Sequence, residues 1–180
     1  MSSRVNSDPP PSRAALSRRS GADLANALGP QRLELLRVAC SPGSSITEEL
    51  HAFVVAFTKL RYRPAVADRI ALTAYELFAN GLSYGSISSM VALELAEEQG
   101  FVLVTVTNEA IQARIKVLVE RCALLRTDAK SIYMEEIRRN VTGGIPRAML
   151  GLARIVHEAG VELSVVAQGS AVTVVGRCKS

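Results

Sequence analysis

The chain has 180 residues, of which 48% are hydrophobic and 21% are charged. This length and composition are typical of one globular core, and they exclude a chain that is disordered throughout. The formal net charge is +4, but the first twenty residues alone carry +3 of it, from four arginines and one aspartate. Beyond residue 30, acidic and basic residues are mixed, so the basic face of a nucleic-acid-binding domain is missing and we expect no nucleic acid partner.

The sequence also argues against a membrane protein and against a zinc-binding protein. The sequence has no run of about 18 apolar residues that could span a bilayer, and its first residues offer Pro and Arg where a secretory signal needs an apolar stretch. Cys40, Cys122 and Cys178 are far apart, odd in number and without a Cys-x-x-Cys pair. We therefore expect a cytoplasmic protein with reduced thiols and no membrane segment.

The N-terminal segment differs from the rest of the chain. Residues 1–30 are rich in Ser, Pro and Arg, and their apolar surface is too small to offset the entropy of ordering them. We predict a disordered basic tail over residues 1–30, of unassigned role, and a folded domain over residues 31–180.

The folded part begins with a strand and two helices. Residues 32–40 have a mixed apolar content typical of a strand, and Ser-Pro-Gly-Ser-Ser follows as a turn. A helix is predicted from Thr47, with an acidic first turn, to about Arg63. Pro64 suits the first turn of the next helix, which we place over residues 65–84 from its apolar residues at spacings of three and four.

The second half of the chain contains two predicted hairpins and two predicted helical segments. Residues 91–110 form two strand-like runs around a polar Ala-Glu-Glu-Gln-Gly turn, which predicts a hairpin. A mainly helical insert is expected over 111–139, then a Val-Thr-Gly-Gly-Ile-Pro loop and a helix over 147–159. A second hairpin over 161–177, turning at Gln168 and Gly169, closes the chain. The apolar face of the insert is interpreted as core or as a contact with a second copy rather than as a ligand groove.

This order of elements predicts the fold class. Strands that pair mainly as hairpins, with helices gathered in blocks, favour an α+β fold. We expect a two-layer sandwich in which helices pack on one face of a mixed, mostly antiparallel sheet.

The helix over residues 65–84 carries the sharpest chemical signal. Glu76 and Asn80 stand four residues apart in Ala-Tyr-Glu-Leu-Phe-Ala-Asn-Gly, so they project from the same helix face. A carboxylate can accept a proton from an attacking hydroxyl, and an amide oxygen is a ligand suited to Mg²⁺ beside phosphates. The simpler alternative is that both side chains lie on the solvated face of an amphipathic helix.

The ordered blocks around this helix resemble those of the GHKL (histidine-kinase-type) ATPase superfamily, which has the Bergerat fold. The resemblance covers about residues 32–177. It implies that Glu76 is the catalytic base and that Asn80 holds Mg²⁺. It also implies that Asn108, after Val-Thr-Val-Thr, faces the adenine of ATP, and that Gly151 in Met-Leu-Gly-Leu-Ala-Arg-Ile belongs to the phosphate-binding block.

The chain departs from the family pattern at three positions. Asn108 replaces an Asp, although an amide still offers an acceptor for the adenine amino group. Ala110 replaces a Gly near the base, and Met149 replaces a Gly near the phosphates. These changes predict a weakened nucleotide site.

Two glycines of the loop before the last helix, and the arginine that begins this helix, are further candidates for phosphate binding. Gly143 and Gly144 would form a hinge or an anion-binding nest, and Arg147 would supply charge. The alternatives are a plain loop for the two glycines and a solvated first-turn position for the arginine.

The resemblance implies two functions, which remain open at this point. As a short chain with a single ATPase-like domain, it is similar to anti-sigma-factor serine kinases and to SiaB-like protein kinases of bacterial partner switching. Such kinases transfer the γ-phosphate of ATP to Ser or Thr of a small protein. Cofactors would then be ATP and Mg²⁺, and the partner a STAS-type antagonist or a sigma-like regulator. The alternative is a non-catalytic pseudo-ATPase that acts as a protein-binding module. A homodimer is compatible with either function.

Overall fold

The computed structural model describes residues 32–41, 46–141 and 148–180 of the chain. Along these residues, five strands and four helices follow one another in the order predicted from the sequence. The predicted tail over residues 1–30 lies outside the described residues. The elements are β1 (Leu33–Cys40), α2 (Thr47–Lys59), α3 (Pro64–Tyr84), β2 (Val91–Glu98), β3 (Phe101–Glu109), α4 (Gln112–Val141), α5 (Ala148–His157), β4 (Glu162–Gln168) and β5 (Ala171–Lys179).

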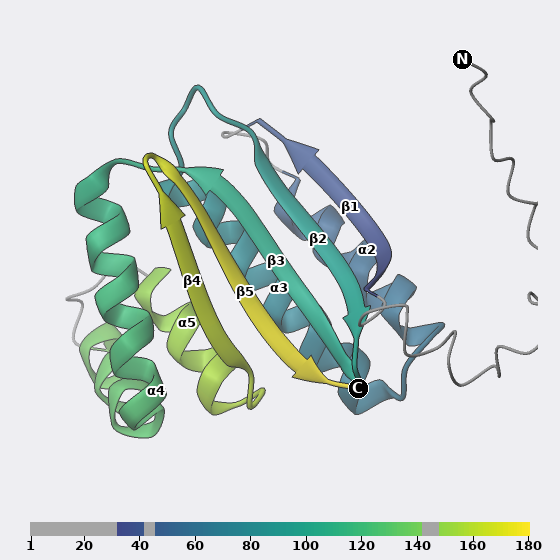
Figure 1. Cartoon of the computed structure of the whole chain (residues 1–180). Coiled ribbons are helices and arrows are strands. Elements are labelled where there is room, and N and C mark those ends of the chain that lie inside the picture. Colours follow the sequence, from purple (N-terminus) through teal and green to yellow (C-terminus); the bar gives the residue numbers. More distant parts are fainter. Residues whose placement is uncertain (1–31, 42–45, 142–147) are drawn as a thin grey trace, which may run out of the picture. The chain divides into compact units, whose positions relative to one another are not determined.

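The strands form one sheet in the order β1-β2-β3-β5-β4 (Figure 1). All four pairs of neighbouring strands are antiparallel, so the described sheet is antiparallel throughout rather than mixed. Both predicted hairpins are present, and β5 pairs with β3 at the centre. Gly100 (φ 79°) and Gly169 (φ 60°) sit at the two hairpin turns in the left-handed region, where a residue without a Cβ avoids strain.

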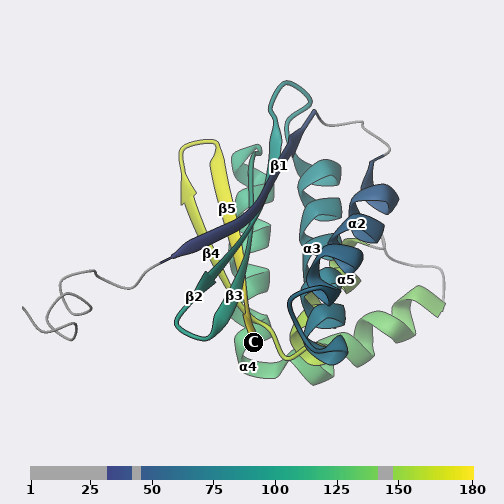
Figure 2. The same ribbon diagram turned by 90° about the vertical axis from the view of Figure 1, so that its right-hand side faces the viewer.

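The helices and the sheet make two layers. α2, α3 and α5 lie on one side of the sheet (Figure 2), and α3 packs on β2, β3 and β5. The first half of α4 runs beside β4 at the edge of the sheet (Figure 1). The predicted two-layer α+β sandwich is therefore confirmed. Within the described residues, no helix has both the length and the apolar character needed to cross a bilayer.

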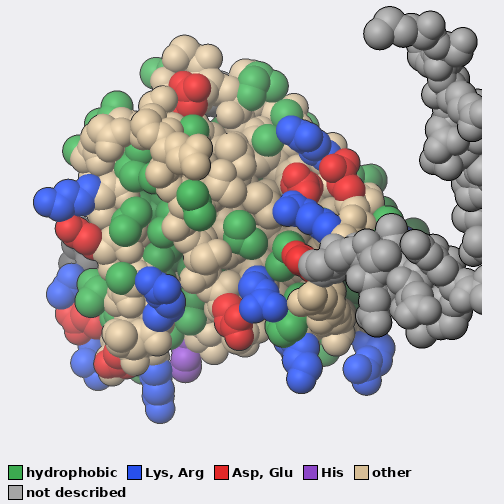
Figure 3. Space-filling model, in the orientation of Figure 1, with side chains coloured by type: hydrophobic (Ala, Val, Ile, Leu, Met, Phe, Trp, Pro, Cys, Tyr) green, Lys and Arg blue, Asp and Glu red, His purple; other side chains and the backbone are tan. Residues whose placement is uncertain are grey.

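The other face of the sheet carries no helix of the described residues (Figure 2). Its central positions are small and uncharged, as in the β3–β5 pairs Thr107–Thr173 and Thr105–Val175. The acidic and basic side chains of this view lie mostly toward its left, right and lower margins (Figure 3). The main core lies on the helix-covered face, around α3.

The core is centred on α3, as the apolar spacing predicts. Every residue of the predicted stripe is buried, because one side of the helix faces the sheet along most of its length. The stripe consists of Ala67, Ile70, Ala71, Ala74, Leu77, Phe78 and Gly81. Its small residues let α3 approach the strands closely.

The opposite side of α3 is not the solvated face that the simpler interpretation offered. α5 packs against part of it, so the Glu76 side chain is only 16% exposed. Thr73 is fully buried against Cys178 of β5. Asn80 is half-buried. The sequence pattern of one helix cannot reveal this cover, because it comes from an element about seventy residues later.

Gly81→Ala is expected to lower the free energy of unfolding by about 1–2 kcal/mol. An added Cβ would lie 2.8 Å from Val91 Cγ1 and 3.0 Å from Val106 Cγ1, and such overpacking outweighs the gain in helix propensity. Urea unfolding measures the change. Ser83→Ala, at an exposed position of the same helix, is the matched control. If Gly81→Ala were as stable as this control, the close approach of α3 to the sheet would be wrong.

The long helical insert is two helices rather than one. Asp128 has non-helical backbone angles (φ −150°, ψ 64°), which divide α4. Its carboxylate accepts a hydrogen bond from the Ser131 backbone N–H at 3.1 Å, so it caps the second half. Arg121 of the first half and Glu136 of the second form an ion pair between side chains that are both largely buried. The two halves therefore fold back on each other.

Candidate functional site

A cavity of about 320 Å³ lies among α3, the first half of α4, β3 and β5. Its size falls at the lower end of the range for small-molecule sites. Polar side chains interrupt its walls, among them Asn80, Asn108, Arg114 and Arg121. The remaining walls are mainly aliphatic and include Leu77, Val106, Ile115, Leu118, Val172 and Val174.

Asn80, which lines this cavity, has unused hydrogen-bonding capacity. Its amide nitrogen is buried and has no hydrogen-bond partner among the described residues. Leaving such a group unpaired costs about 1–3 kcal/mol, and buried polar atoms are otherwise nearly always paired. The fold thus tolerates a destabilising feature at this position, which is typical of a ligand site.

Asn108 lies on the same cavity wall near the end of β3. It is 7% exposed, and its amide nitrogen donates a hydrogen bond of 3.3 Å to the carbonyl oxygen of Gly81. That bond fixes the side chain beside the turn of α3 that carries Asn80. Ala110, two residues later, also lines the cavity, and it packs with Ile115 and Val172 in a small apolar cluster.

Two arginines of α4 complete the cavity. Arg114 Nη1 donates a 3.0 Å hydrogen bond to the carbonyl oxygen of Tyr84, and its guanidinium lies 5.7 Å from the Tyr84 ring centre. Arg121 is paired with Glu136 across the two halves of α4. Arg114 therefore contributes a cation at the end of α3, whereas the charge of Arg121 is balanced within the protein.

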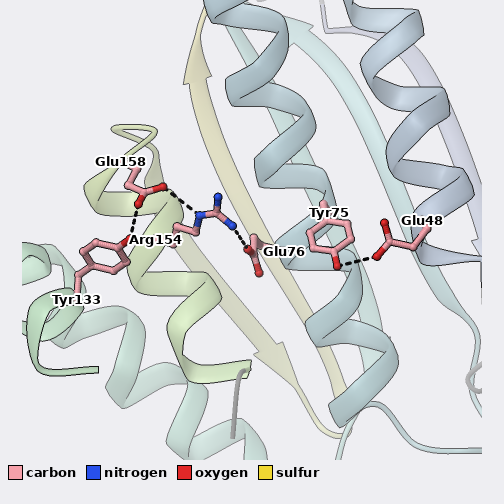
Figure 4. Close-up of polar contacts among 6 residues, drawn as sticks. All are labelled: Glu48, Tyr75, Glu76, Tyr133, Arg154 and Glu158. Carbon is pink, nitrogen blue, oxygen red and sulfur yellow. Dashed lines mark hydrogen bonds and ion pairs between the residues drawn. The ribbon is translucent and has the colours of Figure 1, made fainter. Parts of the chain in front are cut away.

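Glu76 lies one helical turn before Asn80 and faces α5. It is not among the residues that line the cavity. Its Oε1 atom is 3.3 Å from Arg154 Nη1 (Figure 4). Burial raises the pKa of Glu76 above its usual value, and Arg154 acts in the opposite direction. Glu76 is therefore a carboxylate of increased basicity, which suits a general base.

Gly151 is the contact point between α5 and Glu76. A Cβ added there would lie 2.3 Å from Glu76 Oε2 and 3.1 Å from Glu76 Cδ. A glycine at this position is thus explained by the close passage of the carboxylate over the helix backbone. Its assignment to the phosphate-binding block stays a prediction.

The other predicted phosphate residues cannot be compared with the structure. Gly143, Gly144 and Arg147 lie outside the described residues, as does the side chain of Met149. Of the candidates predicted from the sequence, Asn80 and Asn108 share the cavity, while Glu76 and Gly151 meet at the α3–α5 contact.

Sequence reasoning missed the polar residues contributed by α4 and α5. Arg154 of α5 and Glu158, the first residue after α5, are four residues apart. This spacing indicates an ion pair, and Arg154 Nε does lie 3.0 Å from Glu158 Oε2. The Tyr133 hydroxyl donates a hydrogen bond to Glu158 (Figure 4). No sequence signal links Arg154 to Glu76, because that contact joins different helices.

No protein-family model matches the chain, and no curated protein matches it in sequence. Among solved structures, it is similar to a chain in the crystal structure of the SiaB–SiaC complex from Pseudomonas aeruginosa, with a TM-score of 0.59. The match covers 80% of this chain and 89% of that chain at 18% sequence identity. At this identity the likeness is one of fold.

Proposed function

We propose that this chain is a regulatory protein that binds Mg·ATP beside Asn80 and transfers the γ-phosphoryl group to a hydroxyl of a protein partner. The observation that carries the proposal is the cavity, where Asn108 and the unpartnered amide of Asn80 interrupt mainly aliphatic walls. The resemblance of the sequence blocks to GHKL ATPases assigns both residues to the nucleotide. The fold shared with a chain of the SiaB–SiaC complex agrees with that resemblance.

The cavity suits a planar base. Aliphatic walls accept the faces of a ring system, and a few polar groups fix its orientation. Because the Asn108 nitrogen donates to Gly81, the amide oxygen is the atom that would accept a hydrogen bond from the adenine amino group. Ala110 contributes a methyl group to the wall, so the base would pack against it.

Asn80 fits a magnesium ion that is carried by the nucleotide. The described residues contain no group of three or more His, Cys, Asp or Glu side chains placed to hold a metal. Mg²⁺ keeps several waters and commonly takes one or two protein ligands beside phosphate oxygens. The Asn80 amide oxygen would be such a ligand, and the ion would neutralise phosphate charge.

Glu76 would act as the base in the transfer. The hydroxyl oxygen of the partner would form a bond to the γ-phosphorus while the bond from that phosphorus to the β,γ-bridging oxygen breaks, releasing ADP. The hydroxyl proton would pass to the Glu76 carboxylate. Burial raises the pKa of Glu76, and a base whose pKa lies closer to the working pH accepts a proton more effectively.

A protein substrate is the natural acceptor in this proposal. The similar solved structure is a complex of two different proteins, SiaB and SiaC. We extend that observation to this chain and propose a small STAS-type antagonist or a sigma-like regulator as the partner. A homodimer stays a prediction.

A melting experiment tests the nucleotide part of the proposal. A ligand present at a hundred times its Kd, and bound to the folded state alone, adds about 2.7 kcal/mol of stability. We expect the full chain to melt at a higher temperature with millimolar Mg·ATP or Mg·ADP than with MgCl₂ alone. Mg·GTP serves as a control for the base.

An unchanged melting temperature with both adenine nucleotides would contradict the proposal. It would favour the alternative of a pseudo-ATPase that works as a protein-binding module. Equal shifts with Mg·GTP and Mg·ATP would retain a nucleotide site but contradict adenine recognition at Asn108.

A further inference from the structure

We propose that Arg154 is the positioning residue for Glu76, holding its carboxylate against the backbone of α5 at Gly151. The catalytic role of this contact rests on the proposed function. The contact itself, between Arg154 and the Glu76 carboxylate, can be measured in the protein without nucleotide.

Two contacts fix the Glu76 carboxylate. Oε1 is 3.3 Å from Arg154 Nη1, and Oε2 occupies the space that a Cβ on Gly151 would need. The carboxylate is thus held between a cation and a helix backbone. A carboxylate fixed in this way loses little freedom when a hydroxyl approaches, which is how orientation contributes to catalysis.

Arg154 is itself held by a second layer of contacts. Its Nε lies 3.0 Å from Glu158 Oε2, and the other oxygen of Glu158 accepts a hydrogen bond from Tyr133 (Figure 4). The chain Tyr133, Glu158, Arg154 and Glu76 therefore links the second half of α4 to α3 through α5. Because a guanidinium presents several donors in one plane, it can bridge two carboxylates.

The charges around Glu76 give the expected direction. Three charged or titratable groups act on the carboxylate: Arg154 of α5, Glu158 directly after α5, and His51 of α2. Burial raises the pKa of Glu76, and Arg154 is the largest influence that lowers it. Without the Arg154 cation, burial and Glu158 still raise the pKa of Glu76, and of the influences that lower it only that of His51 remains. The pKa of Glu76 therefore rises further, and the carboxylate is ionised only at higher pH.

The test is a carbon-13 NMR titration of the Glu76 carboxyl carbon in the full chain without nucleotide, with the signal assigned through Glu76→Gln. We expect Arg154→Met to move the titration midpoint to higher pH and Arg154→Lys to keep it near that of the wild type. Because the Arg154 side chain is 44% exposed, both variants should fold. Arg126→Met removes an exposed cation that does not face Glu76 and is the matched control.

A midpoint that is the same in Arg154→Met and wild type would overturn the inference. So would an equal rise in Arg126→Met, since that would reflect net charge alone. In a transfer assay, Arg154→Met should lower the rate by roughly 10- to 100-fold and move the pH–rate profile to higher pH, with Mg·ATP affinity unchanged.

The two proposals fail separately. If Arg154→Met shifts the titration but the wild type binds no nucleotide, the proposed function is wrong and the positioning contact stands. If the wild type binds Mg·ATP and the titration does not respond to Arg154→Met, the proposed function stands and the role of Arg154 is wrong.

Discussion

Asn80→Ala is expected to weaken Mg·ATP binding by roughly 100-fold, or about 2.7 kcal/mol at 25 °C. The substitution removes the amide oxygen proposed to hold Mg²⁺ and leaves the aliphatic walls of the cavity in place. Isothermal titration calorimetry with Mg·ATP measures the loss. Ser83→Ala, exposed on the same helix, should bind like the wild type.

The same variant separates binding from folding. In the wild type the Asn80 amide nitrogen is buried without a partner, so replacing it with alanine removes a destabilising group and adds helix propensity. The variant without nucleotide should therefore be at least as stable as the wild type. Lower stability, or wild-type affinity for Mg·ATP, would contradict the assignment of Asn80 as a ligand-facing residue.

Glu76→Gln is expected to lower phosphoryl transfer by about 10²- to 10⁴-fold while preserving Mg·ATP affinity. Glutamine keeps the size of the side chain but cannot accept the hydroxyl proton. A radiolabelled γ-phosphate assay with the purified partner measures transfer, and calorimetry measures binding. Glu98→Gln, at the end of β2, serves as the control for losing one carboxylate.

The pH dependence should distinguish a base from a structural carboxylate. A general base works deprotonated, so the wild-type rate should rise with pH as Glu76 loses its proton. Because burial raises the pKa of Glu76, this rise should lie at higher pH than for an ordinary glutamate. Glu76→Gln should lose this rise, and a variant that retained both the rate and its pH dependence would exclude Glu76 as the base.

The sequence predicted the fold well because its local signals were strong and consistent. The apolar spacing along α3 and the turn sequences of the two hairpins each specify one element without reference to the others. The two halves of α4 were missed because the helical pattern continues across Asp128. Its capping role depends on a single side chain, which bonds the Ser131 N–H.

The site was only partly readable from the sequence. Asn80 and Asn108 were identified from motif blocks, and the structure brings both to one cavity. The residues around Glu76 could not be predicted from the sequence, because its contact with Arg154 joins helices that are distant in the sequence. Pairings of this kind depend on which helix covers which face, and helical periodicity does not encode that.

The central claim is that the cavity beside Asn80 and Asn108 holds the nucleotide. A nitrogen-15 NMR titration with Mg·ADP observes the side-chain amide groups of both residues directly in the full chain. The account predicts that these two signals shift together and saturate with one binding constant. Unmoved Asn80 and Asn108 signals, with changes confined to other parts of the protein, would contradict it.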